Sequence, residues 1–383
     1  MAEWISVKDR LPEDCKSVLA TDGHGVEEAF YYLGEWFNTN AIKCNNVTTG
    51  WTSPLLLLTL LHNRIILGER LNMKIIQVPT GEIMIIDGEN GKLECLSLGD
   101  YGKAINLNQH KKVIHGQLLP LSEKWVCTIS TQYGCSMGCR FCDVPKVGPG
   151  KNATLDDLLN QVGAVRDRNP RIRECQRFNI HYARMGEPTW NWNVLDSAVL
   201  LKDKLRYFNV HPVVSTMMPI KNESLEAFIK MWCHIKNDYY KGEAGLQLSI
   251  NSTSEQEREM MFSHNALPLY DISYIMNKQP DPVGRKYTLN FAIAEYTIDA
   301  ERLAKLFPPS RFICKLTPMH KTNAALRNGI KTIGDYTESY PYEQYEQELK
   351  SAGYEVLVFI ASKEEDESRI TCGNAILSDR KEI

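Results

Sequence analysis

The stretch Cys135-Ser-Met-Gly-Cys139-Arg-Phe-Cys142 contains three cysteines separated by three and then by two residues. This spacing can direct three thiolates at one small centre. A [4Fe–4S] cluster has four irons, so three thiolates leave one iron without a protein ligand. That iron can hold the amino and carboxylate groups of S-adenosylmethionine (SAM), whose reductive cleavage gives a 5′-deoxyadenosyl radical. The motif therefore predicts radical chemistry that is carried by cofactors.

Two other interpretations of these cysteines stay open at this point. Three cysteines and a remote fourth ligand can build a structural zinc site, although zinc ligands usually occur as two separate pairs. Three buried cysteines without any metal are also compatible with the motif. The residues that follow in the chain have to decide between these interpretations.

Length and composition set the bounds for the whole chain. With 383 residues there is room for one large domain and a smaller one. A net charge of −3 gives no global attraction to nucleic acid, so RNA binding would depend on local patches. Eleven cysteines in a chain of this length, three of them in a metal-type motif, favour a reducing cytoplasm over a disulfide scaffold.

Neither a signal peptide nor a membrane span is predicted. The N-terminus lacks a basic segment followed by an apolar one. The apolar run from Pro54 to Leu61 is far too short to cross a bilayer. We therefore expect a cytoplasmic protein that does not associate with membranes.

The chain is predicted to have four parts. Residues 1–56 form a small β-rich domain with strands at 17–21 and 28–32, and the opening Trp4–Pro12 resembles a small domain of unknown function from phage and bacterial proteins. Residues 57–72 form a junction. Residues 73–124 form a β-rich lead-in with strands at 74–78 and 82–86. Residues 125–383 form the main domain.

Strands and helices alternate through the main domain. Strands are predicted at 125–130, 177–182, 211–217, 245–250, 286–293, 312–316 and 355–360, and helices at 154–168, 194–207, 225–236, 300–306 and 342–352. This alternation predicts an α/β fold with a parallel sheet, open or barrel-like. Functional groups gather at the carboxyl ends of such strands. The cysteine stretch follows the first of these strands.

Several polar residues follow the next strands at the same edge. Gly186 and Glu187 come after the second strand, where a glycine permits close approach and a carboxylate can accept hydrogen bonds from the ammonium group of SAM. Ser215 lies at the end of the third strand and Ser249 near the end of the fourth, and each offers a hydroxyl. Taken singly, such residues are more often parts of turns or structural strand ends.

Taken together, these motifs resemble the RlmN/Cfr group of radical SAM RNA methyltransferases from about residue 73 to residue 378. The resembling segments are Gln132–Cys142, Met185–Asn191, Val214–Thr216, Leu248–Ser249 and Asp366–Asn374. The resemblance implies a partial (β/α)6 radical SAM barrel that uses a [4Fe–4S] cluster and SAM. It also implies methylation of adenine at C2 in ribosomal or transfer RNA.

The resemblance assigns a role to Cys372. In the family, the matching cysteine is methylated by one SAM, and a radical made from a second SAM takes hydrogen from that methyl group. The carbon radical adds to adenine, and a second cysteine then takes a proton and releases the product by forming a disulfide. Sulfur suits both tasks because it carries the methyl group and its thiol has a tunable pKa.

The sequence departs from the family pattern at several positions. Thr128 stands where the second cysteine belongs, seven residues before Cys135, and Cys127 is its neighbour. Adjacent residues of a strand point to opposite faces, so Cys127 can replace the missing cysteine only if the strand slips or bulges. His320 stands where the family has asparagine, and Asn251 where it has histidine. The helical RNA-binding domain of the family is replaced by residues 1–56.

The predicted site therefore has three groups of residues. Cys135, Cys139 and Cys142 are the metal ligands, Cys372 and Cys127 are the catalytic pair, and the cofactor contacts are Gly186, Glu187, Ser215, Ser249, Asn251 and His320. The resemblance further implies RNA as partner, an electron donor such as flavodoxin or ferredoxin, and a monomer.

Contact with RNA requires cationic surface. Candidate residues are Arg166, Arg168, Arg171, Arg173, Arg177, Lys111, Lys112, Lys321, Arg327 and Lys331, although such runs can equally form a solvated face. Two further functions stay open. One is a radical SAM enzyme of this fold that modifies another base, a nucleotide or a small molecule. The other is a catalytically silent RNA- or ribosome-binding protein.

Overall fold

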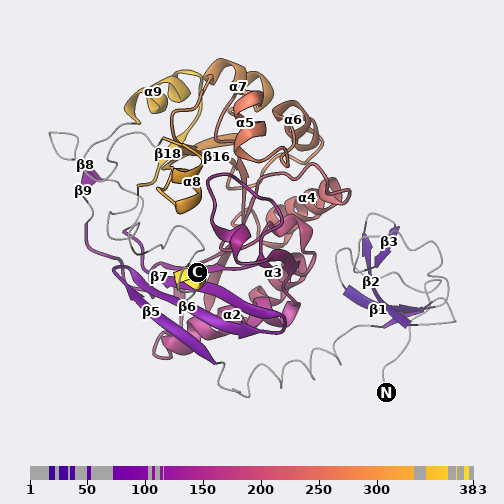
Figure 1. Cartoon of the computed structure of the whole chain (residues 1–383). Helices are drawn as coiled ribbons and strands as arrows, with labels where there is room; N and C mark the ends of the chain where they lie inside the picture. Colours follow the sequence, from indigo (N-terminus) through magenta and orange to yellow (C-terminus); the bar gives the residue numbers. More distant parts are fainter. Residues whose placement is uncertain are drawn as a thin grey trace. The chain divides into compact units, whose positions relative to one another are not determined.

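The computed structural model describes most of the chain from residue 72 onward and isolated strands before it. The described residues are 17–21, 26–32, 35–38, 50–52, 72–101, 106–107, 113–114, 116–331, 342–360, 368 and 375–378. The chain divides into two compact units, Met1–Leu71 and Asn72–Ile383. Figure 1 shows both units, and each is described here by itself. The predicted boundaries at residues 56, 72 and 124 stay predictions.

The first unit contains a four-stranded sheet. Its strands are β1 (Ser17–Thr21), β2 (Val26–Tyr32), β3 (Glu35–Asn38) and β4 (Gly50–Thr52), in the order β3-β2-β1-β4. All of the pairings within it are antiparallel. The β-rich character and the two strands predicted for this region therefore agree with the structure.

The second unit is built on a ten-stranded sheet in the order β18-β17-β16-β15-β14-β13-β10-β7-β6-β5. The strands from β10 to β18 pair in parallel, and β5, β6 and β7 extend the sheet with antiparallel pairs. Their bounds are β5 Met73–Val78, β6 Gly81–Gly88, β7 Gly91–Leu98, β10 Trp125–Ile129, β13 Cys175–Tyr182, β14 Phe208–Thr216, β15 Gly245–Ser249, β16 Tyr287–Ile293, β17 Phe312–Pro318 and β18 Val356–Val358. The predicted parallel α/β sheet is thus confirmed.

Helices connect the parallel strands (Figure 1). They are α2 Leu155–Arg168, α3 Asn193–Lys204, α4 Leu225–His234, α5 Glu255–Met261, α6 Leu269–Asn277, α7 Ala300–Leu306, α8 Asn323–Arg327, α9 Glu343–Ser351 and α11 Ala375–Ser378. The predicted start of α2 is confirmed by a capping box, in which Thr154 and Asp157 each bind the other's backbone N–H. Helix α3 ends at Lys204 rather than at Tyr207, and the prediction missed β7, α5 and α6.

The remaining short elements lie around the cysteine stretch and in two connections. Strands β11 (Gln132–Gly134) and β12 (Pro149–Asn152) form a hairpin that encloses it, with the 3-10 turn η1 (Val144–Lys146) between them. The turn η2 (Pro188–Trp190) follows Glu187, the π-helical turn η3 (Ile235–Tyr239) follows α4, and β8 (Asn106–Leu107) pairs with β9 (Val113–Ile114). Within the described residues, no helix is long and apolar enough to cross a membrane.

The two faces of the parallel sheet differ in exposure. Trp125, Cys127 and Ile129 of β10 are fully buried, whereas Val126 and Thr128 are partly exposed. We call the face that carries Trp125, Cys127 and Ile129 the helix-covered face, because side chains on it contact α2 and α3. We call the opposite face, which carries Val126 and Thr128, the inner face. This alternation follows from the period of two along a strand.

Candidate functional site

The three cysteines of the motif lie in a loop at the carboxyl edge of β10. Cys135, Cys139 and Cys142 are all residues of intermediate exposure. The loop starts directly after β11, where the Cys135 N–H donates to the carbonyl of Gly148 at 3.2 Å. Residues 135–142 therefore stand where the sequence predicts them, at the edge where functional groups of a parallel sheet gather.

Two distant segments hold this cysteine loop by its backbone. The end of α5 and the residues after it make three contacts: Arg140 N to Met261 O, Ser263 Oγ to Gly138 O, and Asn265 Nδ2 to Met137 O. The segment around α8 makes two: Thr322 Oγ1 to Phe141 O, and Asn328 Nδ2 to Arg140 O. All five distances lie between 2.6 and 2.9 Å. Backbone groups that are fixed in this way cannot rearrange freely. The loop conformation is therefore set by contacts with residues more than 100 positions away.

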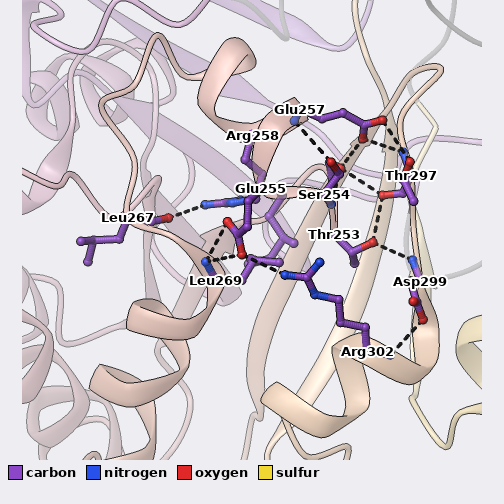
Figure 2. Close-up of polar contacts among 12 residues, drawn as sticks. Thr253, Ser254, Glu255, Glu257, Arg258, Leu267, Leu269, Thr297, Asp299 and Arg302 are labelled. Atoms are coloured by element: carbon purple, nitrogen blue, oxygen red, sulfur yellow. Dashed lines mark hydrogen bonds and ion pairs between the residues drawn. The ribbon is translucent and has the colours of Figure 1, made fainter.

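A polar network around α5 holds the first of these segments (Figure 2). Glu257 of α5 accepts a hydrogen bond from the Thr297 N–H at 2.8 Å, which joins the loops after β15 and β16. The buried guanidinium of Arg258 donates to the Leu267 carbonyl at 3.1 Å. Because α5 continues directly into the segment that contacts the cysteine loop, this network supports the loop indirectly.

Apolar and sulfur-bearing side chains surround the thiols. Cys135 and Cys139 pack against a buried cluster formed by Met137, Met217, Met261, Phe262, Ala294 and Met319. Cys139 Sγ lies 3.6 Å from Met217 Sδ. Burial raises the pKa of Cys135 to about 11 and raises that of Cys139 further. A bound cation would reverse this, because a coordinating thiol is deprotonated.

The three thiols suit a cluster in chemistry and in placement. Within the part of the chain that the structure describes, no group of three or more His, Cys, Asp or Glu side chains is arranged to hold a single metal ion. In a [4Fe–4S] cluster each thiolate binds a different iron, so the sulfurs need not converge on one point. The donor set, three thiols on one loop that is held by its backbone, fits such a cluster.

Gly186 and Glu187 lie beside the cysteine loop. Gly186 has φ of 94°, and a Cβ there would lie 2.5 Å from Gln132 Cβ, so the position requires glycine. The Glu187 carboxylate is buried and accepts hydrogen bonds from the Thr189 N–H at 3.1 Å and the Met217 N–H at 3.0 Å. Burial raises the pKa of Glu187. The carboxylate thus has a fixed position next to Cys135 and Cys139.

The other predicted cofactor residues lie at the same edge. Ser215 and Ser249 are partly exposed at the ends of β14 and β15, and His320 follows β17. Asn251 is buried in the left-handed region with φ of 60°, and its Oδ1 accepts from the Ala292 N–H at 2.9 Å. In this structure the Asn251 side chain therefore joins two strand ends rather than pointing toward solvent. The structure brings all of the predicted cofactor residues to one edge of the sheet.

Cys127 does not belong to this group. It is fully buried on the helix-covered face, and burial raises its pKa well above the usual range. The pairing of β10 with β13 and with β7 is regular, without a bulge that would turn the side chain over. Thr128 occupies the inner face instead. The shifted strand that the Cys127 hypothesis requires is not present, because both neighbouring strands fix the register.

Cys372 lies outside the described residues, but α11 begins three residues after it. Figure 1 shows α11, in yellow, beside β6 and β7. The Ile376 N–H donates to Glu94 Oε2 at 3.1 Å. Helix α11 is therefore docked on the sheet through β7.

Glu94 and Arg184 are two site residues that the sequence analysis missed. They form a buried ion pair that joins β7 to the loop before Gly186, and Glu94 has no exposed surface. The sequence signal for this pair was the carboxylate of Glu94 within the largely apolar residues 93–98 of β7. A charge in such a position is nearly always paired.

The candidate RNA-contact residues are divided between two edges of the sheet. Helix α2 starts at the carboxyl edge and runs back, so the arginines from Arg166 to Arg177 lie at the amino edge, away from the cysteine loop. Arg168 also makes a bidentate ion pair with Glu82. The group Lys321, Arg327 and Lys331, in contrast, lies in or next to the segment that contacts the loop. Lys111 and Lys112 lie outside the described residues.

The fold identifies a class of protein. A crystal structure of a radical SAM methyltransferase from Sphaerobacter thermophilus matches with a TM-score of 0.55 at 18% identity, over 82% of this chain and 84% of that one. This match shows that the chain has the fold of that methyltransferase, which confirms the predicted fold class. No protein-family model matches the chain.

The curated relatives that the chain resembles are RNA methyltransferases named RlmN, in agreement with the resemblance that the motifs predict. The chain is 25% identical over 209 residues to the dual-specificity RNA methyltransferase RlmN of Anaeromyxobacter dehalogenans, covering 51% of this chain and 52% of the relative. It is 26% identical over 267 residues to the probable enzyme of that name from Chlorobium phaeobacteroides, covering 66% and 68%. The chain thus spans about half the length of several curated relatives that it matches. The resemblance of residues 1–56 stays a prediction.

Proposed function

We propose that this chain is a radical SAM enzyme that methylates RNA, with adenine C2 of ribosomal or transfer RNA as its target. The observation that carries the proposal is the meeting of three features at one edge of the sheet. These are the three-thiol loop, the fixed carboxylate of Glu187 and the docked helix that follows Cys372. The named relatives are RNA methyltransferases, which supports the same substrate class.

Each group of residues has a separate task in this proposal. Cys135, Cys139 and Cys142 hold a [4Fe–4S] cluster, and Glu187 with Gly186 receives the ammonium group of SAM. Ser215, Ser249 and His320 line the remainder of the cofactor edge. The cluster and SAM, when bound, supply the radical chemistry. The chain orients the cofactor, keeps the edge apolar around the sulfurs and presents the Cys372 sulfur as the methyl carrier.

Two partners follow from the proposal. RNA would approach the carboxyl edge, where Lys321, Arg327 and Lys331 provide cations near the cysteine loop. The reaction also requires a one-electron donor such as flavodoxin or ferredoxin.

The test of this function is transfer of a labelled methyl group from SAM to Cys372. In the reconstituted protein with a reductant, we expect the label on the peptide that contains Cys372, because this sulfur carries the methyl group. Mass spectrometry of the digested protein and of RNA nucleosides gives both readouts. A Cys372→Ala variant should label neither protein nor RNA, whereas Cys233→Ala, a buried cysteine of α4, should label both. Labelling that persists in Cys372→Ala would refute the assignment.

A second function is favoured by the position of Thr128. A threonine hydroxyl cannot form a disulfide and is a far poorer proton acceptor than a thiolate. With Thr128 on the inner face and Cys127 behind the strand, the two-cysteine release step has no second thiol at this position. A radical SAM enzyme of the same fold with another base, nucleotide or small molecule as substrate is therefore the alternative.

Substitution of Cys127 separates the two functions. We expect Cys127→Ala to behave as the wild type in the denaturing gel mobility of protein–RNA species formed with SAM and reductant, because its thiol faces away from the site. Thr128→Cys places a thiol on the inner face and should release any covalent adduct that the wild type accumulates. An adduct that appears in Cys127→Ala alone would show that Cys127 does reach the substrate.

A further inference from the structure

The inner face of the parallel sheet is polar and reachable. The strand register from β10 to β17 places on this face a row of partly exposed side chains: Thr128, His181, Ser215, Ser249, Asn290 and Lys315. Residues of the helix-covered face on the same strands, such as Ile180 and Leu289, are fully buried. The inner face therefore carries partly exposed polar side chains, whereas the helix-covered face is closed.

Cations on this face outnumber the carboxylates that neutralise them. Burial and the charges of Lys315, Arg285, Lys124 and Arg177 lower the pKa of His181 to about 3, so its ring is neutral at pH 7. Lys124 pairs with Asp100 at 2.6 Å. Lys315, Arg285 and Arg177 form no ion pair with any residue that the structure describes.

Two side chains of the inner face, those of His211 and Lys315, also have unused hydrogen-bonding capacity. The side chain of His211 is 3% exposed, its Nδ1 lies 3.1 Å from Glu243 Oε2, and its Nε2 has no partner among the described residues. The Lys315 ammonium lies over the Phe359 ring at 5.6 Å from the centroid, and no described residue accepts a hydrogen bond from it. A buried polar group without a partner is costly, and partners are usually present.

We propose that the inner face binds a phosphate group of a nucleotide through Lys315. Lys315 pairs in register with Asn290, and Asn290 with Ser249, so the ammonium lies next to the predicted cofactor edge. Lysine and arginine are the side chains that recognise phosphate, and Asn290 and Ser249 add neutral hydrogen bonds. The choice of a nucleotide among anions rests on the proposed function. The phosphate belongs either to an RNA strand or to a free nucleotide.

Calorimetric titration of the full, reconstituted protein tests this site. We expect AMP to bind about 10- to 100-fold more tightly than adenosine, because its phosphate adds charged hydrogen bonds. Lys315→Met should remove this preference. Lys305→Met, which deletes an exposed lysine of α7, should keep it. Circular dichroism of each variant confirms that the fold is intact.

Binding of a second ligand distinguishes the two possible sources of the phosphate. If a short RNA binds the wild type and its affinity falls by a similar factor in Lys315→Met, the phosphate belongs to an RNA strand. If only the affinity for AMP falls, the phosphate belongs to a free nucleotide. Equal affinity for AMP and adenosine overturns the proposal. Weaker SAM binding in Lys315→Met, with AMP unaffected, also overturns it, because the lysine would then serve the cofactor. The titration needs no turnover, so a failure to methylate Cys372 refutes the proposed function and not this site.

Discussion

The Cys139→Ala variant is expected to lose nearly all of its cluster after anaerobic reconstitution. Removal of one thiolate leaves two protein ligands in a loop whose backbone is held in place, so no nearby side chain can take over the third position. Iron and acid-labile sulfide measured per protein chain should fall close to background, and reductive cleavage of SAM should stop with them.

Matched controls make this result specific. Cys127→Ala and Cys372→Ala should each retain the full iron and sulfide content, because neither residue belongs to the loop. Zinc in place of iron and sulfide in the wild type would identify a structural zinc site. A Cys139→Ala protein that keeps a complete cluster and cleaves SAM would refute the ligand assignment.

The Glu94→Gln variant is expected to lose about 3–5 kcal/mol of folding free energy. The substitution removes the carboxylate of Glu94 from a buried ion pair with the guanidinium of Arg184, and removing one partner of such a pair has a cost of this size. Urea unfolding of the full chain measures the loss. Glu82→Gln is the matched control, since its ion pair with Arg168 is partly exposed and is worth at most about 1 kcal/mol.

A double variant separates stability from the docking of α11. Glu94→Leu combined with Arg184→Met replaces the buried pair by apolar side chains, which is often close to neutral for stability. The double variant also removes the acceptor for the Ile376 N–H, because leucine has no side-chain oxygen. We therefore expect faster amide hydrogen exchange at Ile376 and slower methylation of Cys372 even where stability is recovered. Unchanged exchange at Ile376 would show that Glu94 does not hold the helix.

Local patterns in the sequence were enough to predict most of the fold. The alternation of apolar strands with amphipathic helices predicted the parallel sheet, and the Thr154–Asp157 capping box marked the start of α2. Helices α5 and α6 were missed because they are short and are held by contacts with distant loops, such as the contact between Glu257 and Thr297. Such contacts leave no periodic trace in the sequence.

Composition and spacing by themselves predicted the class of chemistry, since three cysteines at these intervals can hold a [4Fe–4S] cluster and leave one iron without a protein ligand. The tertiary structure alone decided which residues share a face. The regular pairing of β10 with two neighbours puts Cys127 under the helices and Thr128 on the inner face, beside His181 of the next strand. The tertiary structure also joins Glu94 to Arg184, 90 positions away, and to Ile376, 282 positions away. Register and long-range ion pairs depend on how strands meet in space, so the order of residues within one strand cannot reveal them.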